Sequence, residues 1–279
     1  MEWITHLNQA MEDLEAHLTE EPDWERLARI ACCSSYHFQR MFTYMAGVSL
    51  SEYLRRRRMS LAAVDLQNGG RVLDVALGYG YTSPTAFSRA FQGIHGVTPS
   101  AAQEGAPVKS YPPIRFHMTV TGGQELQYRI ERREAFRIVG LAAPLEQEIE
   151  KNFQTVPRLW ERVSGENVLP RLLPMMDGEP KGLLGVSACC GEEWTYYIAV
   201  ASSWPAGDFA ACTVPAFTWA VFSGEGRCPQ AIQDLERRVV TGWLPSSGYE
   251  YGDGPDIEVY LAPDPQNAKF QVWIPVVKK

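Results

Sequence analysis

Phe38-Gln39-Arg40-Met41-Phe42 and Phe87-Ser88-Arg89-Ala90-Phe91 carry one pattern, Phe-x-Arg-x-Phe, repeated 49 residues apart. After four more residues each copy continues as Gly-Val-Ser/Thr-x-Ser, starting at Gly47 and Gly96. Two phenylalanines four residues apart share one face of a helix, and the arginine between them points away from it. Because there are two copies, an open solenoid is not expected. The repeat predicts two similar helical units, each with one polar face.

Both predicted helices have signals for where they begin and end. Ser34 or Ser35 can cap the first helix, and Ser83 can cap the second, with Pro84 in its first turn. The glycine that follows each helix suits the left-handed residue that often ends one. These signals favour two capped helices over irregular structure.

A shorter amphipathic helix is predicted before each capped helix, at 24–31 and 72–77, and 50–67 is predicted to be a long connecting helix. A helix, a tight turn and a capped helix with an exposed arginine make the helix-turn-helix plan, in which the second helix enters a major groove of DNA. We therefore expect an all-α domain with two such units. Their arginine-bearing helices are expected to project in parallel, about one DNA turn (~34 Å) apart.

The segments 34–42, 53–59 (Tyr-Leu-Arg-Arg-Arg-Arg-Met) and 78–91 resemble the DNA-binding domain of the AraC/XylS family of bacterial regulators. The resemblance covers roughly residues 3–105. It implies two helix-turn-helix units that read adjacent major grooves. The residues implied at the DNA are Tyr36, His37, Gln39, Arg40, Thr85, Ala86, Ser88 and Arg89. Because Pro84 and Ala86 replace polar residues of the family pattern, the second helix is expected to depend more on phosphate contacts.

The chemistry of these residues leaves some choices open. An arginine can bind guanine O6 and N7 with two hydrogen bonds, worth ~1–3 kcal/mol of discrimination. Gln39 could pair with adenine or anchor a phosphate. In the run 55–58, a helix turns one or two arginines inward, where their stems cover apolar surface, while the others could meet phosphate.

The charge distribution is uneven along the chain, whose net charge is −7. Residues 1–25 contain eight acidic residues and no Lys or Arg, whereas residues 26–89 contain nine Arg against three acidic residues, 9 − 3 = +6. Since local charge sets phosphate affinity, the segment 26–89 is compatible with DNA binding, and we expect the binding to be sensitive to salt.

Several classes of protein are disfavoured by the sequence. There is no run of 18 apolar residues and no basic start followed by an apolar stretch, so neither a membrane span nor a signal peptide is predicted, and a cytoplasmic location is expected. The six cysteines include two adjacent pairs but no Cys-x-x-Cys, so we expect reduced, partly buried thiols, with a redox-sensing role left open. No metal cluster, phosphate loop or Ser-His-Asp set is evident, and neither a metal nor a cofactor is expected.

The domain organisation is predicted as a DNA-binding domain at 1–105, a linker and first strand at 106–124, and a second domain at 125–279. Gly and Pro residues interrupt 103–113, and 114–120 alternates as a strand does. Further strands are predicted at 126–130, 136–141, 182–188, 194–201, 217–222, 257–261 and 269–276, with helices at 149–163 and 229–241. Strand, helix, strand, strand occurs twice, which indicates an α+β fold.

The second domain resembles the GyrI-like, multidrug-type effector-binding domain. Its motifs are 156–160 (Val-Pro-Arg-Leu-Trp), 194–197 (Trp-Thr-Tyr-Tyr), 255–260 (Pro-Asp-Ile-Glu-Val-Tyr) and 273–276 (Trp-Ile-Pro-Val). The resemblance covers about 125–279. It implies two pseudo-symmetric β-α-β-β modules with a ligand cleft between them, which Glu258 faces.

The residue types agree with a ligand site. A buried carboxylate is costly unless it is paired, and aromatic faces attract cations, so a cationic ligand could be the partner of Glu258. Alternatively, Glu258 is the outward residue of an edge strand, and the aromatic residues are ordinary core. The predicted ligand-binding residues are Trp160, Tyr197, Trp219, Tyr249, Tyr251, Glu258, Tyr260 and Trp273.

Three functions are compatible with these features. The leading hypothesis is a non-enzymatic transcription regulator that binds promoter DNA in a sequence-specific way. A small lipophilic effector, cationic or not, would bind the second domain and change how the chain engages DNA or RNA polymerase. The alternatives are a hydrolase of small reactive molecules with Glu258 as general base, and a second domain that docks a protein partner instead of a small molecule.

Overall fold

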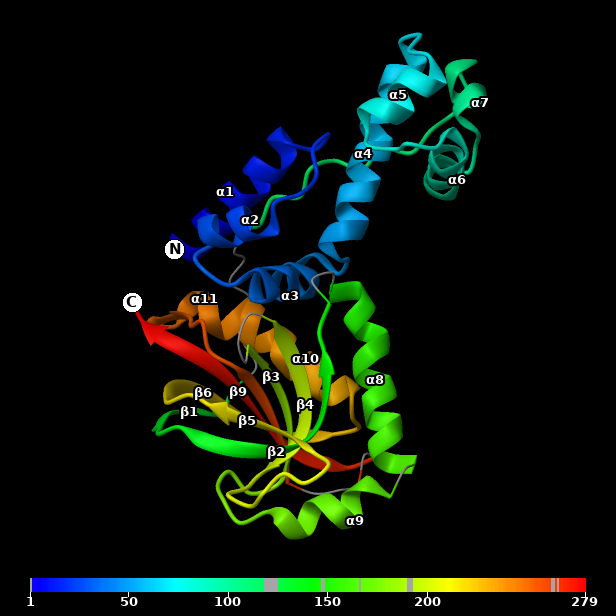
Figure 1. Cartoon of the computed structure of the whole chain (residues 1–279). Coiled ribbons are helices and arrows are strands. Elements are labelled where there is room, and N and C mark those ends of the chain that lie inside the picture. The colour runs from blue at the N-terminus through cyan, green and yellow to red at the C-terminus, as the bar shows by residue number, and fades with distance from the viewer. Residues whose placement is uncertain are drawn as a thin grey trace. The chain divides into compact units, whose positions relative to one another are not determined.

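A computed structural model of the chain describes residues 2–117, 125–146, 149–165, 167–189, 193–261, 264 and 266–279 (Figure 1). The chain divides into two compact units, Met1–Met118 and Thr119–Lys279, each with a hydrophobic core of its own. The first unit is all-α and the second is α+β, as predicted. The first unit continues past residue 105, the predicted end of the DNA-binding domain, because residues 109–116 bind to its helices.

The first unit contains two helix-turn-helix pairs joined by a long helix. Its helices are α1 (Glu2–Ala16), α2 (Trp24–Ile30), α3 (Ser35–Ala46), α4 (Leu50–Gln67), α5 (Val72–Gly78), α6 (Pro84–His95) and α7 (Pro99–Gln103). The pairs α2–α3 and α5–α6 are the predicted units, and α4 is the predicted connection (Figure 1). Helices α1 and α7 were not predicted.

The repeated phenylalanines form the buried faces of the two capped helices, as the sequence pattern predicts. Phe38, Phe42, Phe87 and Phe91 are each 0% exposed. Fully burying such a side chain contributes about 1.5–3 kcal/mol relative to leaving it in water. The sequence repeat therefore reflects two equivalent packing solutions, one in each unit.

The second unit is built on one antiparallel sheet with helices. Its strands are β1 (Tyr128–Arg133), β2 (Phe136–Pro144), β3 (Leu183–Cys189), β4 (Trp194–Ala201), β5 (Ala210–Val214), β6 (Phe217–Gly226), β7 (Tyr249–Tyr251), β8 (Asp256–Tyr260) and β9 (Ala268–Lys278). Its helices are α8 (Ile149–Gly165), α9 (Val168–Leu172), α10 (Gln230–Arg238) and α11 (Leu244–Ser246). The strand order is β1-β6-β9-β8-β3-β4-β2-β5, and β7 pairs with β9.

The sheet order confirms two β-α-β-β modules, β2-α8-β3-β4 and β6-α10-β8-β9. In space the modules read β6-β9-β8 and β3-β4-β2, so a pseudo-twofold axis passes between β8 and β3. These two strands pair antiparallel, with Glu258 opposite Gly185. The residue expected to bind the ligand therefore lies on a central strand at the module junction, and the edge-strand alternative is wrong.

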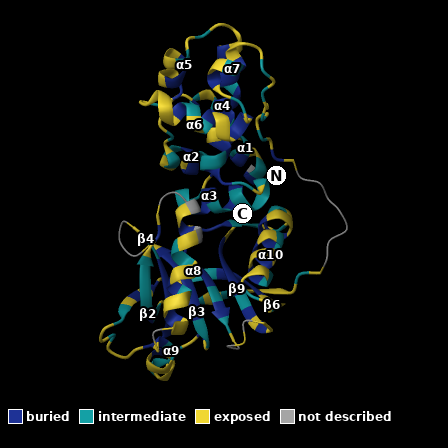
Figure 2. Cartoon of the chain, turned by 90° about the vertical axis from the view of Figure 1, so that its right-hand side faces the viewer, coloured by how far each residue is buried: buried dark blue, intermediate teal, exposed yellow. Residues whose placement is uncertain are grey.

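Both module helices cover the same face of the sheet. Helix α8 contacts β2 and β4, and α10 contacts β6 and β9 (Figure 2). Strands β3 and β8 lie between these two pairs. The other face carries a buried cluster that includes Trp219 and Trp273. Because side chains alternate along a strand, each residue of β8 belongs to one face or the other.

Some elements differ from the prediction. Strands β5 and β7 were missed, and the described part of the predicted strand 114–120, residues 114–117, forms no strand; its remainder lies outside the described residues. Cys212 is disulfide-bonded, whereas all six cysteines were expected to be reduced. Cys32 and Cys228 are free thiols.

Candidate DNA-binding helices and effector site

Helices α3 and α6 begin and end where the sequence signals place them. Ser34 Oγ accepts from His37 N at 3.3 Å, and Ser83 Oγ accepts from Ala86 N at 3.4 Å. Gly47 and Gly96 end the helices with φ of 70° and 80°, in the left-handed region where a side chain is strained. Both helices therefore start and stop on their own local chemistry.

Helix α6 presents a polar face to solvent. Thr85, Ala86 and Arg89 are exposed and Ser88 is half-buried, while Phe87 and Phe91 face the core. Gln92 is also exposed and lies seven residues after Thr85, so it extends this face by one turn. Gln92 was missed from the sequence, although its helical spacing from Arg89 could have revealed it.

Helix α3 differs from α6 in exposure. Tyr36 and Arg40 are half-buried, and Arg40 Nε donates to Tyr44 Oη at 3.2 Å. His37 and Gln39 are only 1% and 2% exposed, so direct contact with DNA would require their side chains to be uncovered. His37 Nδ1 lies 2.9 Å from Ser34 Oγ, which gives this ring a local role at the helix start that was not predicted. Base contacts from α3 stay a prediction.

Two acids from the first 25 residues, Asp13 and Glu15, pair with arginines of the segment 26–89 and lower its charge from +6 to 6 − 2 = +4. Acidic residues and carbonyls already bind most of these arginines, including acids from the first 25 residues. The ion pairs are Arg26–Asp13, Arg55–Glu52, Arg56–Glu52, Arg57–Glu15 and Arg71–Asp74. Arg58 donates to the carbonyls of Leu18 and Glu20. The phosphate attraction is therefore weaker than counting charges suggests.

His95, at the end of α6, is held in one neutral form. Its Nδ1 accepts from Lys109 N at 3.1 Å, so the ring proton is on Nε2, which donates to Met59 O at 3.0 Å. Burial lowers the pKa of His95, and the nearby Lys109 lowers it further, although the bond to Met59 O opposes them. Protonating Nδ1 would remove the acceptor of the Lys109 bond.

We expect His95 to make the protein less stable in mild acid. Its folded pKa lies below the unfolded value, so the unfolded chain binds more protons and the free energy of unfolding falls as pH drops below about 6.5. Urea unfolding between about pH 7.5 and pH 5 measures this. The test is the difference between the unmodified protein and His95→Gln, in which contributions from all other groups cancel. An identical pH slope in both proteins would contradict the assignment.

The candidate effector site is centred on Glu258 in β8. Glu258 Oε2 accepts hydrogen bonds from Tyr260 Oη at 2.8 Å and from Tyr196 Oη at 3.1 Å. Trp160 Nε1, from α8, donates to Tyr196 Oη at 3.2 Å, and its ring meets Tyr260 edge-on with centroids 4.9 Å apart. A half-buried carboxylate is thus held by two hydroxyls beside an indole.

Gly185 makes room for this arrangement. A Cβ at this position would overlap the Tyr196 hydroxyl and lie 2.7 Å from Glu258 Oε2. Gly185 stands opposite Glu258 across the module junction. The Glu258 carboxylate and the Tyr196 hydroxyl occupy the space that a side chain at position 185 would fill. Tyr196 and Gly185 were not among the predicted site residues.

We expect Gly185→Ala to disrupt the site and destabilise the second unit by about 1–3 kcal/mol, the usual cost of overpacking. Urea unfolding measures the change. Gly248→Ala is a matched control, because nothing lies within 4 Å of a Cβ there. Equal stability of the two variants would show that Tyr196 and Glu258 can move aside at no cost.

Glu258 also affects its titratable neighbours. Burial and the Glu258 charge raise the pKa of Tyr260 well above its usual value, so its phenol stays protonated and remains a donor to the carboxylate. Burial, and next the charge of Glu258, raise the pKa of the Cys228 thiol. The Tyr260 phenol and the Cys228 thiol therefore both keep their protons beside the carboxylate.

The structure brings together only part of the predicted ligand set. Trp160, Glu258 and Tyr260 meet, and Tyr251 reaches the same face by donating to Asp256 Oδ1. Tyr249 instead stacks on Trp243, with centroids 6.0 Å apart.

Tyr197, Trp219 and Trp273 lie on the opposite face from Glu258. Register shows this: Tyr197 pairs with Val186, which pairs with Ile257, the neighbour of Glu258. Trp273 pairs with Ile257 and is 0% exposed, as is Trp219. The Arg133 guanidinium already covers the Trp273 ring, 4.9 Å from its centroid. These residues belong to the core on the face opposite Glu258, and a ligand contact from them stays a prediction.

Within the described residues, no helix is long and apolar enough to cross a membrane. Nor does any cluster of three His, Cys, Asp or Glu side chains in that part of the chain suit a metal ion.

The two folds and the Glu258 site define a class of protein, one with an AraC-type helix-turn-helix domain followed by a GyrI-like effector-binding domain. Residues 129–276 match the family described as Cass2, integron-associated effector binding protein, and residues 27–105 match a helix-turn-helix domain. Because the first match spans more than half of the chain, the chain belongs to the Cass2 effector-binding family.

Similar proteins match one part of the chain or the other. The transcriptional regulator Rob of Salmonella typhimurium is 35% identical over 106 residues, 37% of this chain and 37% of Rob. The structure of SAV2435 bound to tetraphenylphosphonium is 21% identical with a TM-score of 0.47, covering 54% of this chain and 94% of SAV2435. An integron cassette protein of Vibrio cholerae is 19% identical with a TM-score of 0.41, covering 55% and 97%. The chain thus spans about a third of Rob's length.

Proposed function

We propose that this protein is a transcription regulator that binds promoter DNA through its helix-turn-helix units and responds to a small lipophilic cation bound at Glu258. The observation that carries the effector part is the Glu258 carboxylate, held by the hydroxyls of Tyr196 and Tyr260 beside Trp160. Hydroxyl donors stabilise the charge of a carboxylate without neutralising it. A cation with an apolar body could supply the opposite charge and pack against the aromatic rings.

The DNA part is supported by the exposed face of α6. Its side chains include one arginine and small polar residues, which suit a major groove. The proposed site of action is the cytoplasm, where effector binding would change how the chain engages promoter DNA or RNA polymerase.

The experiment that tests the function uses the full-length protein. Tryptophan fluorescence is followed during titration with tetraphenylphosphonium, a lipophilic cation, with tetramethylammonium as a cation that lacks aromatic rings. DNA from upstream of the protein's own gene is then tested by gel shift at graded salt, with and without the aromatic cation. We expect saturable fluorescence change, and DNA binding that weakens with salt and shifts with the cation. Absence of DNA binding at low salt would refute the proposal.

A further inference from the structure

We call residues 107–117 the strap: an extended segment that follows α7 without helix or strand. An extended segment outside any sheet has no neighbouring strand to form hydrogen bonds with its backbone N–H and C=O groups. Side chains of the first unit take that role at four strap residues. We call these side chains the anchors. Strap N–H groups donate to four of them: Lys109 N to His95 Nδ1 (3.1 Å), Tyr111 N to Ser60 Oγ (2.9 Å), Ile114 N to Tyr53 Oη (3.2 Å) and Phe116 N to Asn8 Oδ1 (2.8 Å). Strap carbonyls accept from two: Tyr111 O from Arg57 Nη1 (2.6 Å) and Phe116 O from Asn8 Nδ2 (2.9 Å).

The two ends of the strap belong to different helix-turn-helix units. At one end Val108 and Tyr111 pack on the core that contains Phe87 and Phe91. At the other end Phe116 is 9% exposed, and its ring meets Phe42 edge-on with centroids 5.8 Å apart. Between these ends the anchors come from α4. The strap therefore passes from the second helix-turn-helix unit along α4 to the first helix-turn-helix unit (Figure 1).

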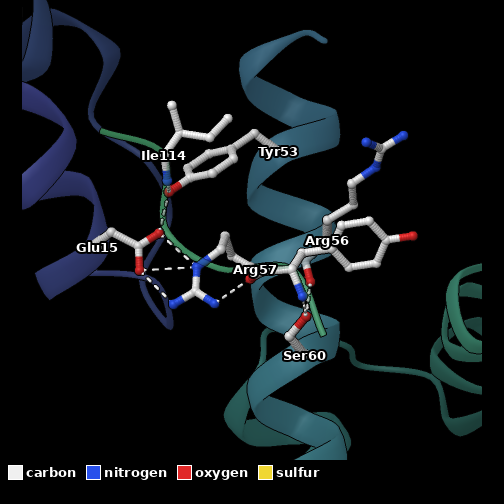
Figure 3. A network of polar contacts seen from close by, with 7 residues as sticks. Glu15, Tyr53, Arg56, Arg57, Ser60 and Ile114 are labelled. Carbon is white, nitrogen blue, oxygen red and sulfur yellow. Dashed lines mark hydrogen bonds and ion pairs between the residues drawn. The ribbon is translucent and has the colours of Figure 1, made fainter. Parts of the chain in front are cut away.

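The middle of the strap is held by a charged network (Figure 3). Arg57 is 8% exposed and donates to Glu15 through Nε at 2.9 Å and Nη2 at 2.8 Å. Tyr53 Oη donates to Glu15 at 2.5 Å and accepts from Ile114 N. Burial, and next its bond to Glu15, raise the pKa of Tyr53, so this phenol keeps its proton. A partly buried pair of this kind holds its members in one geometry, because losing either partner leaves an uncompensated charge.

Between the helices of residues 2–117, the stronger packing contacts lie within one helix-turn-helix unit and its neighbours or involve α4. The main packing contacts join α1 to α2, α2 to α3 and α3 to α4 on one side, and α4, α5, α6 and α7 on the other. Helix α4 is common to both and has 18 residues, about 27 Å at 1.5 Å per residue. A single helix fixes this distance, but orientation also depends on how each unit packs against its end. The strap is a second connection alongside α4.

We propose that the strap is a splint that fixes the orientation of the two helix-turn-helix units, and so sets the spacing between two DNA sites that the chain accepts. The DNA half rests on the proposed function, whereas the splint half is a property of the free protein. Asn8, Tyr53, Arg57 and Ser60 are positioning residues in this account, because they act on the reading helices through the strap.

The splint is tested on the full-length protein by electron–electron double resonance. Ketone-bearing amino acids at Thr19, in the turn before α2, and at Ser100, in α7, are labelled with nitroxides, which avoids the native cysteines; both positions are exposed. Asn8→Ala with Ser60→Ala removes anchors at both parts of the strap. Gln9→Ala with Ser51→Ala is the matched control, because it truncates polar residues on the same two helices. Circular dichroism of every variant measures helix content.

We expect a narrow distance distribution in the unmodified protein and the control, and one about twofold broader in the anchor variant at unchanged helix content. If the strap only stabilises the fold, the anchor variant will have a lower unfolding midpoint but an unchanged width of the distance distribution. That result would overturn the proposal. If the double variant does not fold, Asn8→Asp, which keeps the bond to Phe116 N and loses the bond to its carbonyl, is expected to broaden the distribution less. An unchanged width in that variant overturns the proposal as well.

The DNA half is tested with sites selected from a random library by the unmodified protein. We expect the affinity of that protein to fall when one or two base pairs are inserted between the two half-sites, and the anchor variant to lose at least about threefold less. Equal losses would overturn the DNA half. Failure to select any DNA would refute the proposed function and leave the measured distances to decide the splint.

Discussion

Glu258→Gln is expected to weaken binding of tetraphenylphosphonium by about 100-fold, because a desolvated partner charge contributes roughly 2–5 kcal/mol. Glutamine keeps the size of the side chain and can still accept from the hydroxyls of Tyr196 and Tyr260, so the site should keep its shape. What is lost is the negative charge. Titration of tryptophan fluorescence, checked by calorimetry, measures the change in affinity.

Glu225→Gln is the matched control, since Glu225 is exposed at the end of β6 and far in sequence from the site residues. The affinity of the Glu225→Gln variant for tetraphenylphosphonium should be unchanged. Both variants should retain DNA binding in the absence of the cation. An affinity within about twofold of the unmodified protein for Glu258→Gln would show that charge does not hold the ligand. Turnover of a reactive compound, lost in Glu258→Gln only, would support the hydrolase alternative instead.

Arg89→Ala is expected to weaken binding to the selected DNA site by about 5- to 150-fold, equivalent to ~1–3 kcal/mol, and to relax the preference at one base position. Arg89 is exposed on α6 between the buried Phe87 and Phe91, so its removal should leave the fold intact. Gel shifts against the selected site and against single-base variants of it measure both effects.

Arg71→Ala provides the comparison for Arg89. Its side chain is 81% exposed in the same helix-turn-helix unit, but it is already paired with Asp74 through two hydrogen bonds. We expect Arg71→Ala to weaken binding slightly, and by the same factor for every DNA sequence. If both variants lose the same affinity without any change in base preference, Arg89 contacts phosphate and does not read a base.

Local chemistry made the helices of the first unit predictable. Ser83, Pro84 and Gly96 mark the ends of α6 through interactions with residues a few positions away, and these form whatever the rest of the chain does. The predicted bounds of α4 and β4, 50–67 and 194–201, agree with the structure for the same reason: periodicity is a property of neighbouring residues. The order of strands and helices likewise made the two β-α-β-β modules predictable.

The charge of the arginines, by contrast, depends on residues far away in the sequence. Arg57 and Glu15 are 42 positions apart, and only the packing of α1 beside α4 turns two opposite charges into one neutral pair. Residues 103–113, which include the first part of the strap, were predicted as a linker because Gly105 and three prolines interrupt regular structure, whereas 114–117 were predicted as part of a strand. The anchors of the strap come from helices up to 108 positions away, so no local pattern records them.

For the effector site, the amino-acid order alone was enough to single out Glu258 and Tyr260, since both stand in one short motif on one strand. Which aromatic residues join them depended on register. Tyr196 and Tyr197 are adjacent and chemically identical, yet the pairing of β4 with β3 turns Tyr196 toward Glu258 and Tyr197 to the other face. A strand shifted by one residue would exchange them, and only the contacts of the folded sheet exclude that shift.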